Sequence, residues 1–361
     1  MSGDPSFLMK EPTKVSYAQK YLRLGVMWGA AFVLAFVLIA LVYRQFYGRD
    51  RTVINEAIYE NYITVGEPGY AYYQTAEGHG LTSYGENGLI VDKTIQSDTY
   101  HILFQGDSYV KSAQVSDPDK FTEIIEREWN EQYPSAAIQT LNLGMEGLDL
   151  RYYLSFADNI DNMYHPDKLF LMLGENDFKS IAADPDLLQQ VAAGDFDEPL
   201  VKPVQNSLFK TVTNDIGMRA FMRQLKTQIQ GFSQQNTATE EDALATESLD
   251  REAVRIQLQA LQSLWGDRLV ILYFVWIPDL GEGLPETYDD MIMEEMDALG
   301  ISYVSLYESF RAAFAAHTPP TGFNNSLIGH GHWNRLGHQL AADEIVGYLK
   351  TAVPHTLEAG Q

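Results

Sequence analysis

Ser108 and His332 are the two residues whose types and surroundings best suit nucleophilic chemistry. Ser108 ends the sequence Gly-Asp-Ser directly after the apolar run 100–105, and the glycine permits a sharp turn that leaves the serine at a strand end. His332 lies near the C-terminus, within GHGHWNRLGH. A serine hydroxyl becomes a good nucleophile when a neighbouring imidazole accepts its proton. The pair therefore predicts one nucleophilic site, although each motif alone could be an ordinary turn or a packed loop.

Two further motifs could stabilise the oxyanion that such a reaction forms. Gly147 ends the sequence NLGMEG after a second apolar run, and a glycine there lets a backbone N–H approach the developing charge. Asn176 lies in GEND after a third run, and its side-chain amide can donate to the same oxygen. Taken alone, the first motif could be a turn and the second a helix N-cap. We expect both to lie beside Ser108 at one edge of a sheet.

Five apolar runs alternate with helical segments, which predicts an α/β fold with a parallel sheet covered by helices on both faces. In such sheets ligands bind at the carboxyl ends of the strands, where the candidate residues fall. Strands are predicted at 100–105, 137–143, 168–173, 268–277 and 302–306. Helices are predicted at 116–132, 149–163, 286–299, 308–316 and 336–350.

A helical insertion is predicted at about 179–265, because a structureless loop of this length is uncommon in a compact domain. It includes the basic amphipathic segment 207–232, the acidic linker 233–248 and a predicted helix at 249–264. The insertion could form a lid over the site, a membrane-facing element or ordinary packing, and we expect packing.

Residues 24–43 contain no charged residue and predict a transmembrane helix at 22–44. No small-residue cleavage pattern follows this stretch, which favours a membrane anchor over a cleaved signal peptide. Basic residues are slightly more numerous before the span than after it. This favours a cytoplasmic polar tail at 1–21 and an extracytoplasmic domain at 99–352, anchored in the cytoplasmic membrane. The Tyr- and Gly-rich segment 45–98 would connect the span to this domain.

Composition excludes several classes of function. The formal net charge of -24 argues against nucleic acid as a partner, because such binding needs a basic surface. The chain has no cysteine, so disulfides and thiolate metal sites are excluded. Apolar residues make up 45% of the chain, which is enough to bury a sizeable core.

These motifs together resemble the blocks of the SGNH hydrolase superfamily, the GDSL-type esterases and lipases. The matching sequences are FQGDSYV, NLGMEG, LGEND and HWNRLGHQLAADEI, within residues 99–350. The resemblance implies a three-layer α/β/α sandwich with a flavodoxin-like parallel sheet of about five strands, and no cofactor. It implies Ser108 as the nucleophile and His332 as the base, with Gly147, Asn176 and the Ser108 N–H holding the oxyanion.

The chain departs from this family at the acid that orients the histidine. An aspartate is expected two or three residues before His332, where this chain has His330 and Gly329. Three alternatives follow: a Ser–His dyad oriented by a backbone carbonyl, an acid from elsewhere in the chain, or a weakened site. His330 is a candidate third member, and the acids that follow predicted strands are Glu175, Asp177 and Asp279.

Metal binding by His330, His332 and His338 is a further alternative, which we do not predict. The helical HEXXH spacing of zinc hydrolases is absent from the sequence. His338 also fits a Gly-His pair that makes hydrogen bonds at the start of the last helix.

The predicted function is a membrane-anchored serine esterase that hydrolyses O-acyl esters, above all O-acetyl esters, of cell-surface or extracellular carbohydrate. An acylated carbohydrate or lipid would be the substrate, and membrane or polysaccharide-assembly proteins would be the partners. The alternatives are an O-acyltransferase that uses the same acyl-enzyme and a non-catalytic glycan-binding or assembly protein that kept the fold.

Overall fold

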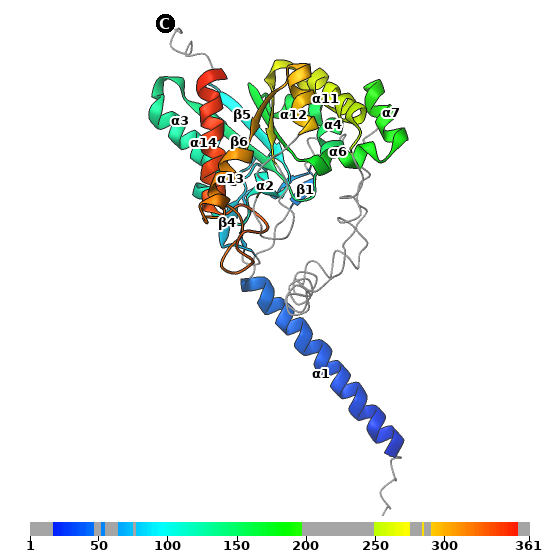
Figure 1. Cartoon of the computed structure of the whole chain (residues 1–361). Coiled ribbons are helices and arrows are strands. Elements are labelled where there is room, and N and C mark those ends of the chain that lie inside the picture. The colour runs from blue at the N-terminus through cyan, green and yellow to red at the C-terminus, as the bar shows by residue number, and fades with distance from the viewer. Residues whose placement is uncertain are drawn as a thin grey trace, which may run out of the picture. The chain divides into compact units, whose positions relative to one another are not determined.

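The computed structural model describes residues 17–46, 52–54, 64–74, 77–196, 249–274, 284 and 290–352. The chain divides into two units, each of which is described by itself. The first contains the long helix α1 (Tyr17–Phe46), and the second contains a β-sheet with its covering helices (Figure 1).

A parallel five-stranded sheet in the order β6-β5-β7-β8-β9 forms the centre of the second unit. Gly106 at the end of β5 pairs with Gly144 at the end of β6, so these strands finish level at one edge. The predicted α/β fold is confirmed, and part of the predicted strand 268–277 lies outside the described residues. The strands are β5 (Tyr100–Gly106), β6 (Ile138–Gly144), β7 (Lys168–Leu173), β8 (Leu269–Tyr273) and β9 (Ser302–Ser305).

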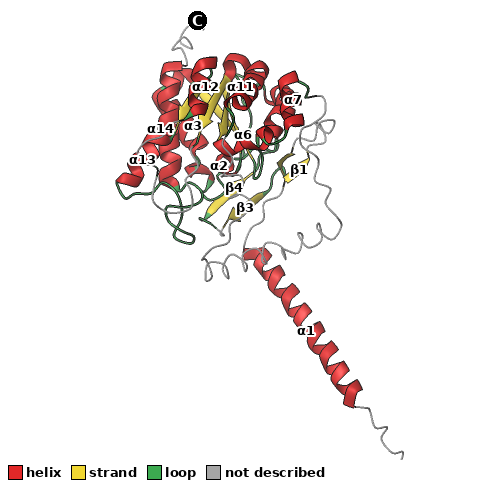
Figure 2. Ribbon diagram, turned by 45° about the vertical axis from the view of Figure 1, so that its right-hand side comes forward, coloured by secondary structure: helices red, strands yellow, loops and turns green. Residues whose placement is uncertain are grey.

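Helices cover both faces of this sheet, which gives the three layers (Figure 2). One face packs against α4 (Leu150–Ser155), α5 (Ala157–Tyr164), α6 (Glu175–Ala182), α7 (Pro185–Ala193), α11 (Arg251–Trp265) and α12 (Met291–Leu299). The other packs against α2 (Ser108–Lys111), α3 (Phe121–Gln132), α13 (Tyr307–Ala315) and α14 (Arg335–Ala352).

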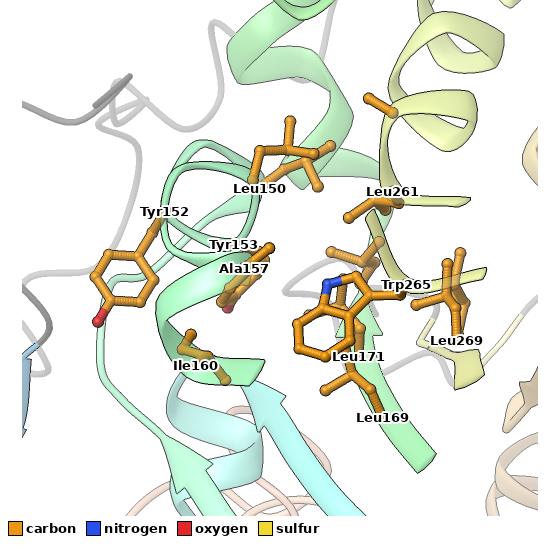
Figure 3. Packing of buried hydrophobic residues seen from close by; sticks show 14 of the residues in the cluster. Leu150, Tyr152, Tyr153, Ala157, Ile160, Leu169, Leu171, Leu261, Trp265 and Leu269 are labelled. Atoms are coloured by element: carbon orange, nitrogen blue, oxygen red, sulfur yellow. The ribbon is translucent and has the colours of Figure 1, made fainter. Parts of the chain in front are cut away.

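Alternation along β7 divides the core into two clusters, because successive strand residues point to opposite faces. Leu169 and Leu171 join the cluster around α11, where they lie close to Trp265 (Figure 3). Phe170 and Met172 point the other way, into the cluster around α3 and α14. The sheet is therefore buried on both faces, as parallel sheets usually are.

Two predicted helices are each interrupted. The segment predicted as one helix at 116–132 consists of a 3₁₀ turn at Asp117–Asp119 and the helix α3, separated by Lys120 in an extended conformation. The Lys120 ammonium is fully buried and donates to the carbonyls of Ser112 and Val115, so its backbone follows this tertiary contact rather than the helix.

The segment predicted at 149–163 is likewise two helices, α4 and α5. Phe156, which separates them, has φ -117° and ψ 13°, outside the helical region. Its side chain is buried in the core, next to Tyr152.

The segment before the sheet forms two antiparallel hairpins. The first pairs β1 (Thr52–Ile54) with β2 (Thr64–Gly66), and the second, the β3–β4 hairpin, pairs β3 (Ala71–Gln74) with β4 (Gly80–Ser83). Tyr72 and Tyr84 pack with Ile90, which also forms an antiparallel bridge with Asn142 of β6. The described parts of 64–98, within the segment 45–98 that is predicted to connect the membrane span to the domain, therefore pack against that domain.

The described parts of the predicted insertion are packed helices. Side chains of α6, α7 and α11 lie in the same core cluster as the sheet residues of one face. The basic amphipathic segment 207–232 and the acidic linker 233–248 lie outside the described residues.

Helix α1 has the length and composition of a membrane span. The stretch Gln19–Ile39 has a mean hydropathy of 2.2, and none of its residues is buried. A signal sequence near the N-terminus would have the same properties. The structure therefore supports an apolar helix over the predicted span 22–44.

We expect a substitution of Gly144 by alanine to be strongly destabilising. A Cβ atom there would lie 2.1 Å from the backbone nitrogen of Lys111, where β6 approaches α2. Relieving such an overlap costs about 1–3 kcal/mol. Gly347→Ala is the matched control, because Gly347 lies inside α14 with no atom near its added Cβ, and alanine there should stabilise by roughly 0.5–1 kcal/mol. Urea unfolding of both variants tests this, and equal midpoints would contradict it.

Candidate active site

Ser108 is the first residue of α2, two residues after the end of strand β5, which lies between β6 and β7 in the sheet. Asp107 caps this short helix by accepting a hydrogen bond from the Tyr109 N–H, with an N···O distance of 2.9 Å. A Cβ at Gly106 would lie 2.4 Å from Cγ2 of Val110, so the strand can turn straight into α2 only with glycine at this position. Gly-Asp-Ser thus places the serine hydroxyl at the carboxyl edge of the sheet.

His332 lies between a hydroxyl and a carboxylate. Its Nε2 is 2.8 Å from Oγ of Ser108, and its Nδ1 is 2.6 Å from Oε2 of Glu77. The backbone N–H of His332 also donates to Oε1 of Glu77 at 3.0 Å. The His332 side chain is 26% exposed and that of Glu77 is 21% exposed, so substrate can reach the site from solvent.

Sequence motifs do not single out Glu77, which is an acid from elsewhere in the chain, one of the three alternatives left open. His330 is the candidate third member, yet both ring nitrogens of His332 face Ser108 and Glu77. The backbone N–H of His330 instead donates to the carbonyl of Leu327. Glu77 lies in the β3–β4 hairpin, and its only local signal is a glycine-rich turn, Glu-Gly-His-Gly. Nothing in that turn indicates a partner 255 residues away.

The other acids considered from the sequence make different contacts. Oδ2 of Asp177 accepts a hydrogen bond from the Gly174 N–H at 2.8 Å and caps α6. Glu175 forms an ion pair with Lys179, one turn along the same helix. Asp279 lies outside the described residues. Asp177 and Glu175 therefore make contacts other than a hydrogen bond to His332.

The loop that carries His332 is fixed by its two following residues. Asn334 donates to the carbonyl of Pro319 and accepts from the Leu336 N–H, which caps the start of α14. Trp333 is 1% exposed and so anchors the loop in the core. Its aromatic neighbours are Tyr109, Phe121, Phe274, Phe310 and His338.

Polar contacts hold the turn after β5 against β6 and the segment that follows it. The side-chain amide of Asn142 donates to the carbonyl of Val110 at 2.9 Å. Nζ of Lys111, on a side chain only 1% exposed, lies 3.3 Å from Oε1 of Glu146. Glu146 directly precedes Gly147, so these contacts tie the Ser108 turn to the segment that contains Gly147.

Gly147 and Asn176 follow the two strands that flank β5. Gly147 has φ +73°, a conformation that favours glycine, and it is exposed. Asn176 is the second residue of α6, directly after β7, and its side chain is also exposed. Since β5 lies between β6 and β7, both residues follow strands adjacent to the one that carries Ser108.

Acidic groups near the sheet edge have raised pKa values. Burial, with a smaller effect from the nearby carboxylates of Asp107 and Asp149, raises the pKa of Asp177 to about 8, although the hydrogen bond from the Gly174 N–H acts in the opposite direction. Burial also raises the pKa of Asp107, although the Tyr109 N–H and His332 act in the opposite direction. Asp177 is therefore mostly protonated at neutral pH.

His338 is a core residue. It is 1% exposed and stacks on Phe121 with an interplanar angle of 3°. Burial lowers the pKa of His338 to about 3, with smaller effects from Lys120 and His332, so the ring is neutral. Within the described ranges, no group of three His, Cys, Asp or Glu side chains is arranged to hold a metal ion.

Comparison with known proteins gives structural likeness only. No protein-family model and no curated protein matches the sequence. A solved lipase/acylhydrolase from Enterococcus faecalis is 14% identical with a TM-score of 0.39, over 70% of this chain and 96% of that one. An acetyl xylan esterase from Geobacillus stearothermophilus is 13% identical with a TM-score of 0.36, over 70% and 94%. A member of the lipolytic protein G-D-S-L family from Veillonella parvula is 13% identical with a TM-score of 0.37, over 70% and 99%.

We expect Asp177→Asn to remove one source of the pH dependence of stability. In the unfolded chain an aspartate titrates near roughly pH 4, whereas Asp177 in the folded protein titrates near about 8. Between these values the folded state holds more protons, so this group destabilises the fold progressively as pH rises, and its full cost is present above pH 8.

Asparagine keeps an acceptor for the Gly174 N–H but cannot ionise. The melting temperature of Asp177→Asn relative to wild type should therefore increase from about pH 4 to about pH 8. Calorimetry of both proteins across this range measures the difference. A difference that stays constant with pH would rule out the raised pKa.

Proposed function

We propose that this protein is a serine ester hydrolase, with Ser108 as nucleophile and His332 as general base and acid. The observation that carries the proposal is the 2.8 Å distance between Oγ of Ser108 and Nε2 of His332. This distance is in the range required for proton transfer between a nucleophile and its base. The position of Ser108 at the carboxyl edge of a parallel sheet also supports it, because ligands bind there in such folds.

The reaction would proceed in two steps through an acyl-enzyme. Oγ of Ser108 attacks the ester carbonyl carbon while its proton moves to Nε2 of His332. The bond to the alcohol oxygen then breaks, and that oxygen takes the proton from Nε2. In the second step water attacks the acyl group, Nε2 removes a proton from the water and returns it to Oγ, and the carboxylic acid leaves.

Backbone and side-chain donors would stabilise the oxyanion in both steps. The N–H of Ser108, the N–H of Gly147 and the amide of Asn176 belong to turns that follow three adjacent strands. Donors placed before the reaction need no reorganisation as charge develops, and loss of one donor typically lowers kcat by about 10²–10³-fold.

The substrate we propose is an O-acyl ester, above all an O-acetyl ester, of a cell-surface or extracellular carbohydrate. Partial exposure of the His332 and Glu77 side chains supports a site that accepts an ester group carried on a large molecule. The apolar helix α1 supports a domain tethered at a membrane, and the weak excess of basic residues before it supports an extracytoplasmic site.

Two alternatives to hydrolysis are an O-acyltransferase and a non-catalytic protein that kept the fold. An O-acyltransferase would pass the acyl group to an alcohol acceptor in place of water. A non-catalytic glycan-binding or assembly protein would keep the fold without forming an acyl-enzyme, and the carboxylate of Glu77 beside Nδ1 favours the catalytic proposal.

We expect Ser108→Ala to lose nearly all release of acetate from an activated acetyl ester. Without the nucleophile the acyl-enzyme cannot form, and kcat should fall by about 10⁴-fold or more. The exposed Ser97 offers a matched control, since Ser97→Ala should leave the rate unchanged.

Covalent labelling by a fluorophosphonate probe tests the same serine without a known substrate. Wild type and Ser97→Ala should be labelled, whereas Ser108→Ala should not. Equal ester hydrolysis by wild type and Ser108→Ala, or an unlabelled wild type, would overturn the proposed function.

Fractionation of cells that express the full chain tests the membrane anchor. We expect the intact chain in the membrane fraction, because a helix as long and apolar as α1 can span the hydrocarbon core. Intact mass measurement distinguishes an uncleaved membrane anchor from a cleaved signal sequence. A mature protein that lacks the α1 residues would instead identify a cleaved signal sequence.

A further inference from the structure

We propose that Glu77 is the carboxylate that positions His332, which makes the β3–β4 hairpin a part of the active site. This inference rests on the proposed roles of Ser108 and His332. It assigns the acid to a segment that precedes every strand of the parallel sheet in the sequence. In the family that the sequence motifs resemble, the acid is expected two or three residues before the histidine.

The two hydrogen bonds of Glu77 fix both the tautomer and the orientation of the imidazole. Oε2 accepts from Nδ1, which leaves Nε2 unprotonated and facing Oγ of Ser108. Oε1 accepts from the backbone N–H of His332 itself, so the carboxylate is held to the main chain as well as to the ring. A carboxylate in this position stabilises the imidazolium that forms when the serine gives up its proton.

Gly331 supplies independent evidence that the loop is shaped around this carboxylate. Its φ is +75°, and a Cβ atom there would lie 2.3 Å from Oε1 of Glu77. Any side chain at this position would displace the carboxylate from the His332 N–H. The glycine directly before the histidine thus leaves space for a residue from a distant part of the chain.

The hairpin is held at its tip by a paired amide contact. The Gly78 N–H donates to Oδ1 of Asn325, and Nδ2 of Asn325 donates to the Gly78 carbonyl, both at 2.9 Å. On its other side the hairpin approaches the segment after α2, where the His79 N–H donates to the carbonyl of Gln114. Gly78 and His79, the two residues after Glu77, are therefore held by segments close to His332 and Ser108 in the sequence.

A second set of contacts holds strand β4 to the segment before α3. The buried Lys120 ammonium donates to Oγ1 of Thr82 at 3.1 Å, and Ser83 donates to Oδ2 of Asp117 through its N–H and its hydroxyl. Together with the tip contact, these bonds hold the β4 side of the hairpin, on which Glu77 lies. The carboxylate is thus preorganised on a fixed element.

A purely structural role for Glu77 would predict a different result from a positioning role. A structural carboxylate would tie the hairpin to the loop, and its loss would lower stability with no particular effect on turnover. A positioning carboxylate lowers kcat with little change in KM, because its effect appears as charge develops on His332.

The first test compares Glu77→Gln, Glu77→Asp and Glu77→Ala in the full chain. We expect Glu77→Gln to lower kcat on the order of 10²–10⁴-fold with a nearly unchanged KM, as expected for loss of a triad acid. Glu77→Asp should retain part of the lost rate. Added formate should restore part of the kcat of Glu77→Ala, because a small carboxylate can occupy the vacated space. Glu86→Ala, an exposed acid in a nearby turn, should behave as wild type and not respond to formate.

The second test reads the hydrogen bond itself by proton NMR and does not depend on turnover. The His332 Nδ1 proton, shared with a carboxylate, should give a strongly downfield resonance in wild type. It should be lost in His332→Gln and shifted upfield in Glu77→Gln, while Glu86→Ala retains it. Asn325→Ala should weaken this resonance and lower kcat less than Glu77→Gln does.

The outcomes separate this inference from the proposed function. If wild type hydrolyses esters through Ser108 and Glu77→Gln has wild-type kcat, the inference fails and the proposed function stands. If wild type neither hydrolyses esters nor is labelled, the proposed function fails, and the downfield resonance still decides whether Glu77 holds His332. Absence of that resonance in folded wild-type protein would overturn the inference.

Discussion

The candidate site depends on one imidazole held between two oxygen atoms from distant parts of the chain. Oγ of Ser108 comes from the turn after strand β5, and the carboxylate of Glu77 comes from a hairpin that precedes the sheet. His332 itself belongs to the loop before the last helix. Neither contact is useful alone, because the ring must be a base at Nε2 while its Nδ1–H is held. The surrounding structure has to place three separate segments within hydrogen-bond distance.

The parallel sheet places the Ser108 turn, and an aromatic cluster joins the His332 loop to it. Gly106 and Gly144 finish level at one edge, which puts the Ser108 turn beside the turn that contains Gly147. Trp333 packs against Tyr109, one residue after the serine, and so couples the histidine loop to α2 through burial of apolar surface. The same core that stabilises the fold thereby sets the distance between nucleophile and base.

Local sequence patterns predict the sheet and single out Ser108 and His332, because each of these residues lies in a motif that its own neighbours define. The runs at β5 and β7 are compact and apolar, and Gly-Asp-Ser follows the first directly. The break at Lys120 is not predicted, since its cause is a buried ammonium bonded to Ser112 and Val115 rather than a helix-breaking residue. Glu77 is missed for the same reason. Its role is defined entirely by contacts with residues far away in the sequence, and only the two glycines that follow it, Gly78 and Gly80, hint at a close approach.

The distribution of charge at the sheet edge is consistent with the proposed chemistry. The protein carries a net charge of -24, and any carboxylate near the oxyanion would oppose the negative charge that develops there. Asp177, which directly follows Asn176, has a pKa raised to about 8 by burial and by its acidic neighbours, so it is mostly neutral at physiological pH. Glu77 instead has one oxygen at Nδ1, the ring nitrogen remote from the serine. The negative charge of Glu77 lies where it stabilises an imidazolium, and the negative charge of Asp177 is reduced next to Asn176, the candidate oxyanion donor. Burial therefore contributes to the electrostatics of the site as well as to the fold.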